Sequence, residues 1–205
     1  MRELLVLTAD TDAQAVMQVV LQERYQAIGL NKAVDAEVDR YHGRDAGLVK
    51  EGTGLLRLRK KAFQRVILLW DHHGSGKTDP GQVQQQLSQQ LSNDSWSGNH
   101  LAQAIVPELE EWLWHSPEAI RKYLAIKDAT LQQWQNCFAN QQKRTVDECQ
   151  QQLPKELFFY CMQQKENRHP RPEDYREIAR KASLKAWQNS DSFRAIITQL
   201  KAWFL

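Results

Sequence analysis

The stretch RVILLWDHHGSGKTDPG, residues 65–81, contains two patterns that could carry chemistry. Its first half places Asp71, His72 and His73 directly after an apolar run, as in a metal site at the end of a strand. Its second half, Gly-Ser-Gly-Lys-Thr, matches the end of a phosphate-binding loop. The two interpretations predict different chemistry, so residues elsewhere in the chain must decide between them.

The phosphate-loop interpretation fails on spacing. The full motif requires a glycine at position 71, where the chain has Asp71, whose negative charge would repel a phosphate. A phosphate-binding helix should also begin at the Gly-Lys step, whereas Asp79 and Pro80 predict a helix start several residues later. We therefore predict no nucleotide site, and we attribute Gly74 and Gly76 to a sharp turn after the strand.

Acidic residues follow three of the apolar runs that predict strands. Asp10 follows residues 3–7, Asp71 follows residues 66–70, and several glutamates follow residues 101–106. In an open parallel sheet, ligands bind at the edge formed by the carboxyl ends of the strands. We therefore predict that Asp10, Asp71 and either Glu108 or Glu110 come together at that edge.

The chemistry of this group would be that of a divalent metal ion. Oxygen ligands suit Mg²⁺ or Mn²⁺, and a histidine ligand would favour Mn²⁺. Such an ion activates water and neutralises charge in phosphodiester cleavage. The metal-binding candidates are Asp10, Asp71, His73 and Glu108, the catalytic candidates are Asp71, Glu108 and Glu110, and the further candidates are Asp12, His72, Glu111, Arg44 and Asp45.

Most of these residues also have an ordinary structural explanation. Asp10 could cap the first helix, and the glutamates at 108, 110 and 111 would lie in a first helical turn, where acids favour the helix dipole. His72 and His73 could be solvated loop residues. Asp71 has the strongest functional case, because a charge directly after a fully apolar strand requires a reason.

Strand and helix patterns alternate along the first half of the chain and predict an α/β fold. Residues 3–7, 33–41, 66–70 and 101–106 predict strands, and residues 11–29, 47–63, 79–91 and the segment from 107 predict helices. Right-handed crossovers would give a mostly parallel sheet with helices on both faces. Residues 66–70 are apolar on both faces and predict a central strand, whereas residues 33–41 alternate and predict a strand nearer an edge. Thr11 and Gln14 fit a capping box at the start of the first helix.

The second half of the chain has no strand pattern. From Pro117 onward there are three or four helical stretches, and the last, over residues 190–205, has Ser190 or Asp191 as its expected cap. We therefore expect an α/β core over residues 1–116 and a helical extension over residues 117–205 that packs on it.

Composition excludes several classes of protein. The 205 residues are 41% hydrophobic and 25% charged with a net charge of +2, which gives no global basic field for nucleic acid. No apolar run approaches the roughly 20 residues that span a bilayer, and the N-terminus does not read as a secretory signal. The three cysteines form no Cys-x-x-Cys pair. We expect free thiols, a cytoplasmic location and no membrane partner.

Five motifs occur in the order and at the spacing of a known family: LTADTD, HGRDAG, WDHHGSG, PELEEWLW and SDSFRAIITQLKAWF. Over nearly its whole length the chain resembles a family of bacterial TOPRIM-like proteins, some of which belong to methylation-associated phage-defence systems. The resemblance implies an α/β fold in which acidic residues and Mg²⁺ act on nucleic acid. It matches Asp71 to the family's acid after the third strand, and Glu108 and Glu110 to its two glutamates after the fourth.

The chain departs from this family at two positions. The usual glutamate after the first strand is absent, with Asp10 as the nearest substitute, and His73 stands where the family carries a glutamate. Losing the carboxylate at 73 weakens a two-metal site, which leaves one metal, a different metal or lost catalysis as alternatives.

Two hypotheses about function follow. The first is a metal-dependent, nuclease-like component of a bacterial defence system that acts on DNA or RNA. The second is a non-catalytic TOPRIM-like scaffold subunit that binds defence-system proteins; a nucleotide-binding switch is a weaker third. Carboxylates that are each paired with Arg or Lys would favour the scaffold.

Overall fold

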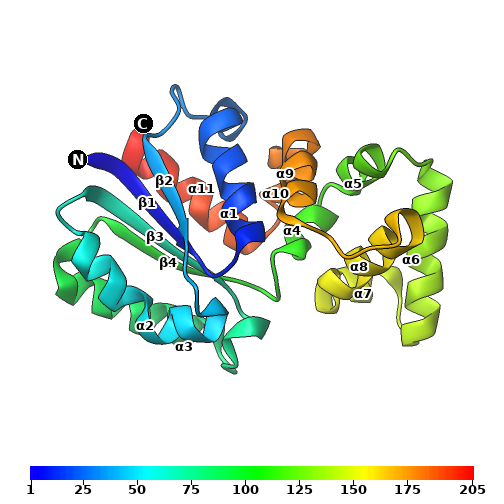
Figure 1. The fold of residues 1–205 in the computed structure, drawn as a ribbon, viewed down its shortest axis with the longest axis horizontal. Coiled ribbons are helices and arrows are strands. Elements are labelled where there is room, and N and C mark those ends of the chain that lie inside the picture. The colour runs from blue at the N-terminus through cyan, green and yellow to red at the C-terminus, as the bar shows by residue number, and fades with distance from the viewer.

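The computed structural model describes the whole chain, residues 1–205, and shows an α/β fold (Figure 1). Its four strands form one all-parallel sheet in the order β2-β1-β3-β4. The predicted parallel α/β architecture is therefore confirmed. The strands are β1 (Arg2–Thr8), β2 (Ala36–Arg40), β3 (Phe63–Asp71) and β4 (His100–Ile105).

Helices connect the strands and make up all of the regular structure after β4. Between the strands lie α1 (Thr11–Gln18), extended by a π-helical turn (Val19–Glu23) and a 3-10 turn (Tyr25–Ile28), α2 (Arg44–Arg59), a 3-10 turn (His73–Ser75), α3 (Pro80–Leu91) and a π-helical turn (Ser92–Trp96). After β4 come α4 (Glu110–Trp114), α5 (Pro117–Leu124), α6 (Asp128–Gln142), α7 (Val146–Gln152), α8 (Pro154–Glu166), α9 (Pro172–Lys181), α10 (Leu184–Trp187) and α11 (Asp191–Phe204). None of these helices combines the length and the hydrophobicity required to cross a bilayer.

Strand β3 lies inside the sheet, as its doubly apolar pattern predicts. It pairs with β1 on one side and with β4 on the other, and its residues from Val66 to Asp71 are all buried. Strand β2 pairs only with β1 and alternates between buried and partly exposed residues, so it forms an edge. Both predictions from periodicity are confirmed.

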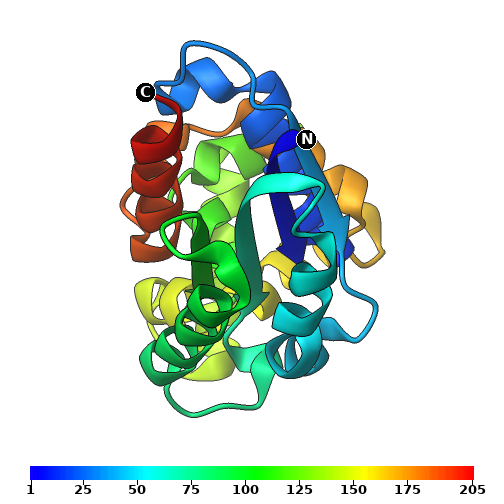
Figure 2. The ribbon, with the colours of Figure 1, turned by 90° about the vertical axis from the view of Figure 1, so that its left-hand side faces the viewer.

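Helices cover the sheet (Figures 1 and 2), and two separate cores lie on its two faces. Leu5 and Leu68 point into a core of 15 buried residues that includes positions of α2 and α3. Leu4 and Ile67 point the other way, into a core of 41 buried residues that takes in α1 and most of the later helices. Residues on both sides of position 116 contribute to this larger core, so the late helices and the sheet are stabilised by the same apolar burial.

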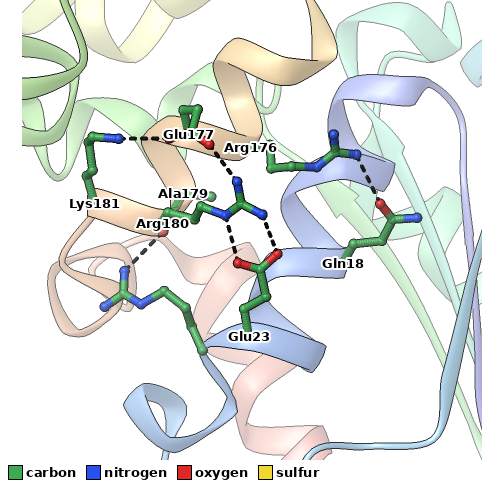
Figure 3. Close-up of polar contacts among 8 residues, drawn as sticks. Gln18, Glu23, Arg176, Glu177, Ala179, Arg180 and Lys181 are labelled. Atoms are coloured by element: carbon green, nitrogen blue, oxygen red, sulfur yellow. Dashed lines mark hydrogen bonds and ion pairs between the residues drawn. The ribbon is translucent and has the colours of Figure 1, made fainter.

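Polar contacts also join helix α9 to the end of α1 (Figure 3). Arg180 donates two hydrogen bonds of 2.7 Å to the carboxylate of Glu23. Arg24 donates to the carbonyls of Ala179 and Ala182, which a helix C-terminus leaves without intrahelical partners. We call the group of Glu23, Arg176, Glu177, Arg180 and Lys181 the α1–α9 charge cluster.

Two helix starts differ from the sequence prediction. The cap of α1 is Asp10, whose Oδ1 accepts the amides of Asp12 at 3.1 Å and Ala13 at 2.8 Å. The capping box at Thr11 is therefore wrong, and Gln14 instead donates to the Val38 carbonyl at 2.8 Å.

Helix α2 starts at Arg44 rather than at Gly47, and it ends at Arg59 because Phe63 already belongs to β3. The caps of α3 at Asp79 and of α11 at Ser190 lie where the sequence places them.

Candidate functional site

The carboxyl ends of β1, β2 and β3 surround one cleft of about 520 Å³. Its lining residues belong to the end of the sheet, which faces helices α4 and α8 in Figure 1. The carboxylates that line it are Asp10, Asp12, Asp45, Asp71 and Glu108, and the basic side chains are Arg40, His42, Arg44 and Lys155. We call this the acidic cleft.

The structure brings together the acids that strand order predicted to meet. Asp10, Asp71 and Glu108 come from the ends of β1 and β3 and from the segment after β4, and all three line the acidic cleft. Asp12, Asp45 and Arg44 join them, so six predicted candidates, five of them acids, share one surface. Their chemical role stays a prediction.

In three of these carboxylates one oxygen accepts hydrogen bonds from backbone amides, and the other oxygen has no hydrogen bond within the protein. Asp10 Oδ1 accepts the two helix amides described above. Asp71 Oδ1 accepts the Leu109 amide at 2.9 Å, and Asp45 Oδ1 accepts the Asp71 amide at 2.7 Å. Proteins orient metal-binding carboxylates in this way, with a second hydrogen-bonding shell behind them. The helix-cap role of Asp10 and a ligand role are therefore compatible.

A close backbone approach explains one glycine in the loop after β3. Any Cβ at Gly74 would collide with the carboxylate of Asp45, so only glycine leaves room for that side chain. Gly76 has a φ of 67°, the left-handed conformation expected of a turn glycine. The sequence interpretation thus holds for Gly76, whereas Gly74 is required by the position of Asp45.

Glu110 lies buried behind the cleft rather than on its surface. Only 2% of the residue is exposed, its Oε1 accepts the Tyr175 hydroxyl at 2.5 Å, and its Oε2 has no hydrogen-bond partner. Burial raises the pKa of Glu110 to about 7. This residue therefore has a buried, unpartnered oxygen and is poised to hold or release a proton near neutral pH.

Burial and repulsion between carboxylates raise the pKa values of several acids in the cleft. Burial, followed by repulsion from Asp10 and Glu110, raises the pKa of Asp71 well above its ordinary value. The same causes raise the pKa of Asp12 to about 7, and burial raises the pKa of Asp45. The site concentrates negative charge that favours either protons or a bound cation.

Lys155 is a site residue that sequence reasoning missed. It comes from α8, lines the cleft, and places its Nζ 3.6 Å from Glu108 Oε1. Burial lowers its pKa, but the carboxylates of Glu110, Glu108, Asp71 and Asp10 outweigh burial and raise it above the ordinary value. A single lysine in a helix carries no sequence signal that would single it out.

Three predicted candidates lie away from the cleft. His73 is exposed and is not part of the lining, and His72 has a buried Nδ1 without a partner. Glu111 lies elsewhere on α4 and pairs with His115 at 2.5 Å.

The donor set of the cleft fits a hard cation with few protein ligands. No three of the histidine, cysteine and carboxylate side chains are grouped so as to hold one metal ion by themselves. Mg²⁺ usually keeps several waters and takes one or two carboxylates together with substrate phosphates. The free oxygens of Asp10, Asp45 and Asp71 suit that mode of binding, whereas a closed structural site of four protein ligands is not formed.

The Gly-Ser-Gly-Lys-Thr loop borders a different cleft, of about 470 Å³, beside α2 and α3. The first amides of α3, those of Gly81 and Gln82, donate to the carboxylate of Asp79, and the Lys77 amide donates to Ser75 Oγ. Three of the amides at the end of this loop and the start of α3 are thus already used within the chain. That this loop binds no nucleotide stays a prediction.

Comparison with protein-family models, with curated proteins and with solved structures gave no match to this chain. The TOPRIM-like resemblance therefore rests on the motifs quoted above.

Proposed function

We propose that the chain is a TOPRIM-like, divalent-metal-dependent protein that cleaves nucleic acid within a bacterial defence system, with the acidic cleft as its active site. One observation carries this proposal. Asp10, Asp12, Asp45 and Asp71 line one cleft, and none of them forms a salt bridge with an arginine or lysine. Partly or fully buried carboxylates without a counter-charge are costly unless a ligand supplies one.

Residues in and behind the cleft have two roles under this proposal. Asp71 and one of Asp10, Asp45 or Glu108 would hold Mg²⁺ or Mn²⁺, and water would complete the coordination. When bound, the ion would polarise a phosphate and activate water. Glu110, held by the Tyr175 hydroxyl, would exchange a proton near neutral pH.

Basic side chains on the β2 side of the cleft support a phosphate-bearing substrate. Arg40 and Arg44 are exposed there, and an Arg40 nitrogen lies 3.1 Å from His42 Nδ1. Guanidinium groups bind phosphate oxygens in a two-pronged geometry. Positive charge is thus available beside the acids, even though the chain as a whole is nearly neutral.

The direct test is a cleavage assay on single- and double-stranded DNA and RNA. Purified protein should nick or degrade at least one of these with Mn²⁺ or Mg²⁺, and EDTA should stop the reaction. Asp71→Asn is the matched control, because asparagine keeps the oxygen that accepts the Leu109 amide and removes the charge. Inert wild-type protein on every substrate with both metals would contradict the proposal.

One contact favours the alternative, a non-catalytic scaffold subunit. Lys155 already pairs with Glu108, so part of the charge of the cleft is neutralised within the chain. A scaffold would bind proteins of the same defence system whether or not metal is present. Co-purification with the products of neighbouring genes, unchanged by EDTA and by Asp71→Asn, together with an inert cleavage assay, would support this alternative.

A further inference from the structure

Lys155 occupies an unusual position for a lysine. It lies in the first turn of α8, directly after Pro154, where the helix dipole disfavours a positive charge. The start of that helix is fixed, because the Pro154 carbonyl accepts the indole N–H of Trp114 at 2.9 Å and Leu157 is fully buried. The backbone thus holds Lys155 at the mouth of the acidic cleft.

The side chain of Lys155 is only loosely held there. Its ammonium forms a 3.6 Å ion pair with Glu108 and makes no hydrogen bond. About 34% of the side chain is exposed, which gives it a route back to solvent. Its charge nonetheless acts on Asp71 and Glu110, as well as on Asp12. Lys155 therefore neutralises part of the charge of the cleft, and a single long ion pair holds it there.

We propose that Lys155 is a built-in counter-ion of the acidic cleft and that a divalent metal ion competes with it for the same carboxylates. This inference rests on the proposed metal site. When metal binds, the ammonium would move away from Glu108 toward solvent, or toward a phosphate of the substrate. A side chain of α8 would then change position when metal binds at the carboxyl ends of the strands.

The charge on Lys155 should therefore weaken metal binding. Two cations in one cleft repel each other, and at a separation of about 6 Å their repulsion corresponds to about tenfold or more in affinity. We expect Lys155→Met to bind Mn²⁺ at least about tenfold more tightly than wild type. Lys155→Arg keeps the charge and should bind as wild type does. Isothermal titration calorimetry with the full chain measures these affinities.

Thermal unfolding without metal supplies a second readout. Lys155→Met should have a lower Tm than wild type in EDTA, because the carboxylates lose their counter-ion, and Mn²⁺ should raise its Tm more than that of wild type. Lys165→Met is the matched control, since it removes an exposed lysine without a salt bridge from the same helix. It should leave both the Tm and the Mn²⁺ affinity unchanged.

A double variant separates charge from packing, even where Lys155→Met folds poorly. Lys155→Met with Glu108→Gln removes both charges of the pair, so part of the lost stability should return if Lys155 acts as a counter-ion. If the double variant recovered no stability, the aliphatic part of Lys155 would stabilise the protein by packing alone, and the inference would be overturned.

The calorimetry separates this inference from the proposed function. Equal Mn²⁺ affinity in wild type and Lys155→Met would overturn the competition and leave the metal site standing. Absence of Mn²⁺ binding to every variant would remove the metal site itself.

Discussion

Two charged regions of this molecule are built in opposite ways. In the α1–α9 charge cluster, Glu23 pairs with Arg180, and Glu177 pairs with Arg180 and Lys181 (Figure 3). Hydrogen bonds from these basic side chains lower the pKa of both glutamates. In the acidic cleft four aspartates have no such partner, and burial raises the pKa of Asp12, Asp45 and Asp71.

The difference separates charges that are paired within the chain from charges that have no salt-bridge partner in it. The cluster lies between α9 and the end of α1, and its ion pairs are complete within the chain. The cleft holds excess negative charge that the fold does not neutralise, and such an arrangement is typical of functional sites. The first region therefore has a structural role, and a binding role for the second is what we propose.

The largest expected effect is that of Asp71→Asn. Loss of the central carboxylate should lower Mn²⁺ affinity by about 100-fold or more and abolish metal-dependent cleavage. The metal-free variant should unfold at a higher temperature than wild type, because a buried, repelled charge is gone. Calorimetry and thermal unfolding in EDTA check the two parts. A variant with unchanged affinity, or with a lower Tm in EDTA, would contradict the role given to Asp71.

The two regions should also respond to pH with opposite sign. Asp12 and Glu110 have ordinary pKa values of 3.8 and 4.5, and the fold raises both to about 7. Between about pH 4 and pH 7 the folded state therefore binds more protons than the unfolded state, and stability falls as pH rises. The pKa values of Glu23 and Glu177 are lowered, so their contribution is lost only below about pH 4.5.

The measurement for this prediction is the Tm of metal-free protein across pH. Relative to wild type, Asp12→Asn with Glu110→Gln should become more stable as pH rises from 4.5 to 7, reaching a gain of about 5 °C. Saturating Mn²⁺ should remove most of that difference. If the difference in Tm between the double variant and wild type did not change with pH, the pKa values of Asp12 and Glu110 would not be raised in the metal-free protein.

A smaller effect is expected in the α1–α9 charge cluster. Glu23→Gln breaks the ion pair with Arg180, but both side chains are about two-fifths exposed, at 43% and 41%. Exposed pairs contribute little, so we expect a fall in Tm of no more than about 2 °C and no change in Mn²⁺ affinity. Weaker Mn²⁺ binding in this variant would contradict the claim that the α1–α9 charge cluster takes no part in metal binding.

The smallest effect is expected at position 73. The family resemblance implies that His73→Glu restores a metal-binding carboxylate and increases activity with Mg²⁺. His73 is exposed and lies outside the lining of the cleft, so the geometry predicts Mg²⁺-dependent cleavage within about twofold of wild type. A clear gain with Mg²⁺ would favour the resemblance over the geometry described here.

Much of the architecture follows from residue patterns. Val66–Trp70 is apolar on both faces and could only be stable with cover on both sides, which places β3 inside the sheet. Once the strands are parallel, Asp10 and Asp71 must share an edge, because each follows the carboxyl end of a strand. Local pattern and topology together thus predict the meeting of the acids.

The remaining parts of the site depend on tertiary contacts. Along the sequence, several helices lie between the last strand and Lys155, and only the packing of α8 brings this residue to the cleft. Glu110 is buried by Tyr175 of α9, a contact between two helices that no local spacing predicts. The sequence predicts a helix from residue 47, whereas α2 begins at Arg44, and its first turn carries Asp45, which accepts the Asp71 amide.

The most direct test of the central claim is a crystal of the full chain soaked in Mn²⁺ and measured for anomalous scattering. The account predicts a peak in the acidic cleft, about 2.0–2.6 Å from the free carboxylate oxygen of Asp71 and from at least one oxygen of Asp10 or Asp45. It also predicts that the Lys155 ammonium lies farther from Glu108 than 3.6 Å in that crystal. A cleft without a peak at saturating Mn²⁺, with Lys155 still against Glu108, would contradict the metal site and favour the scaffold.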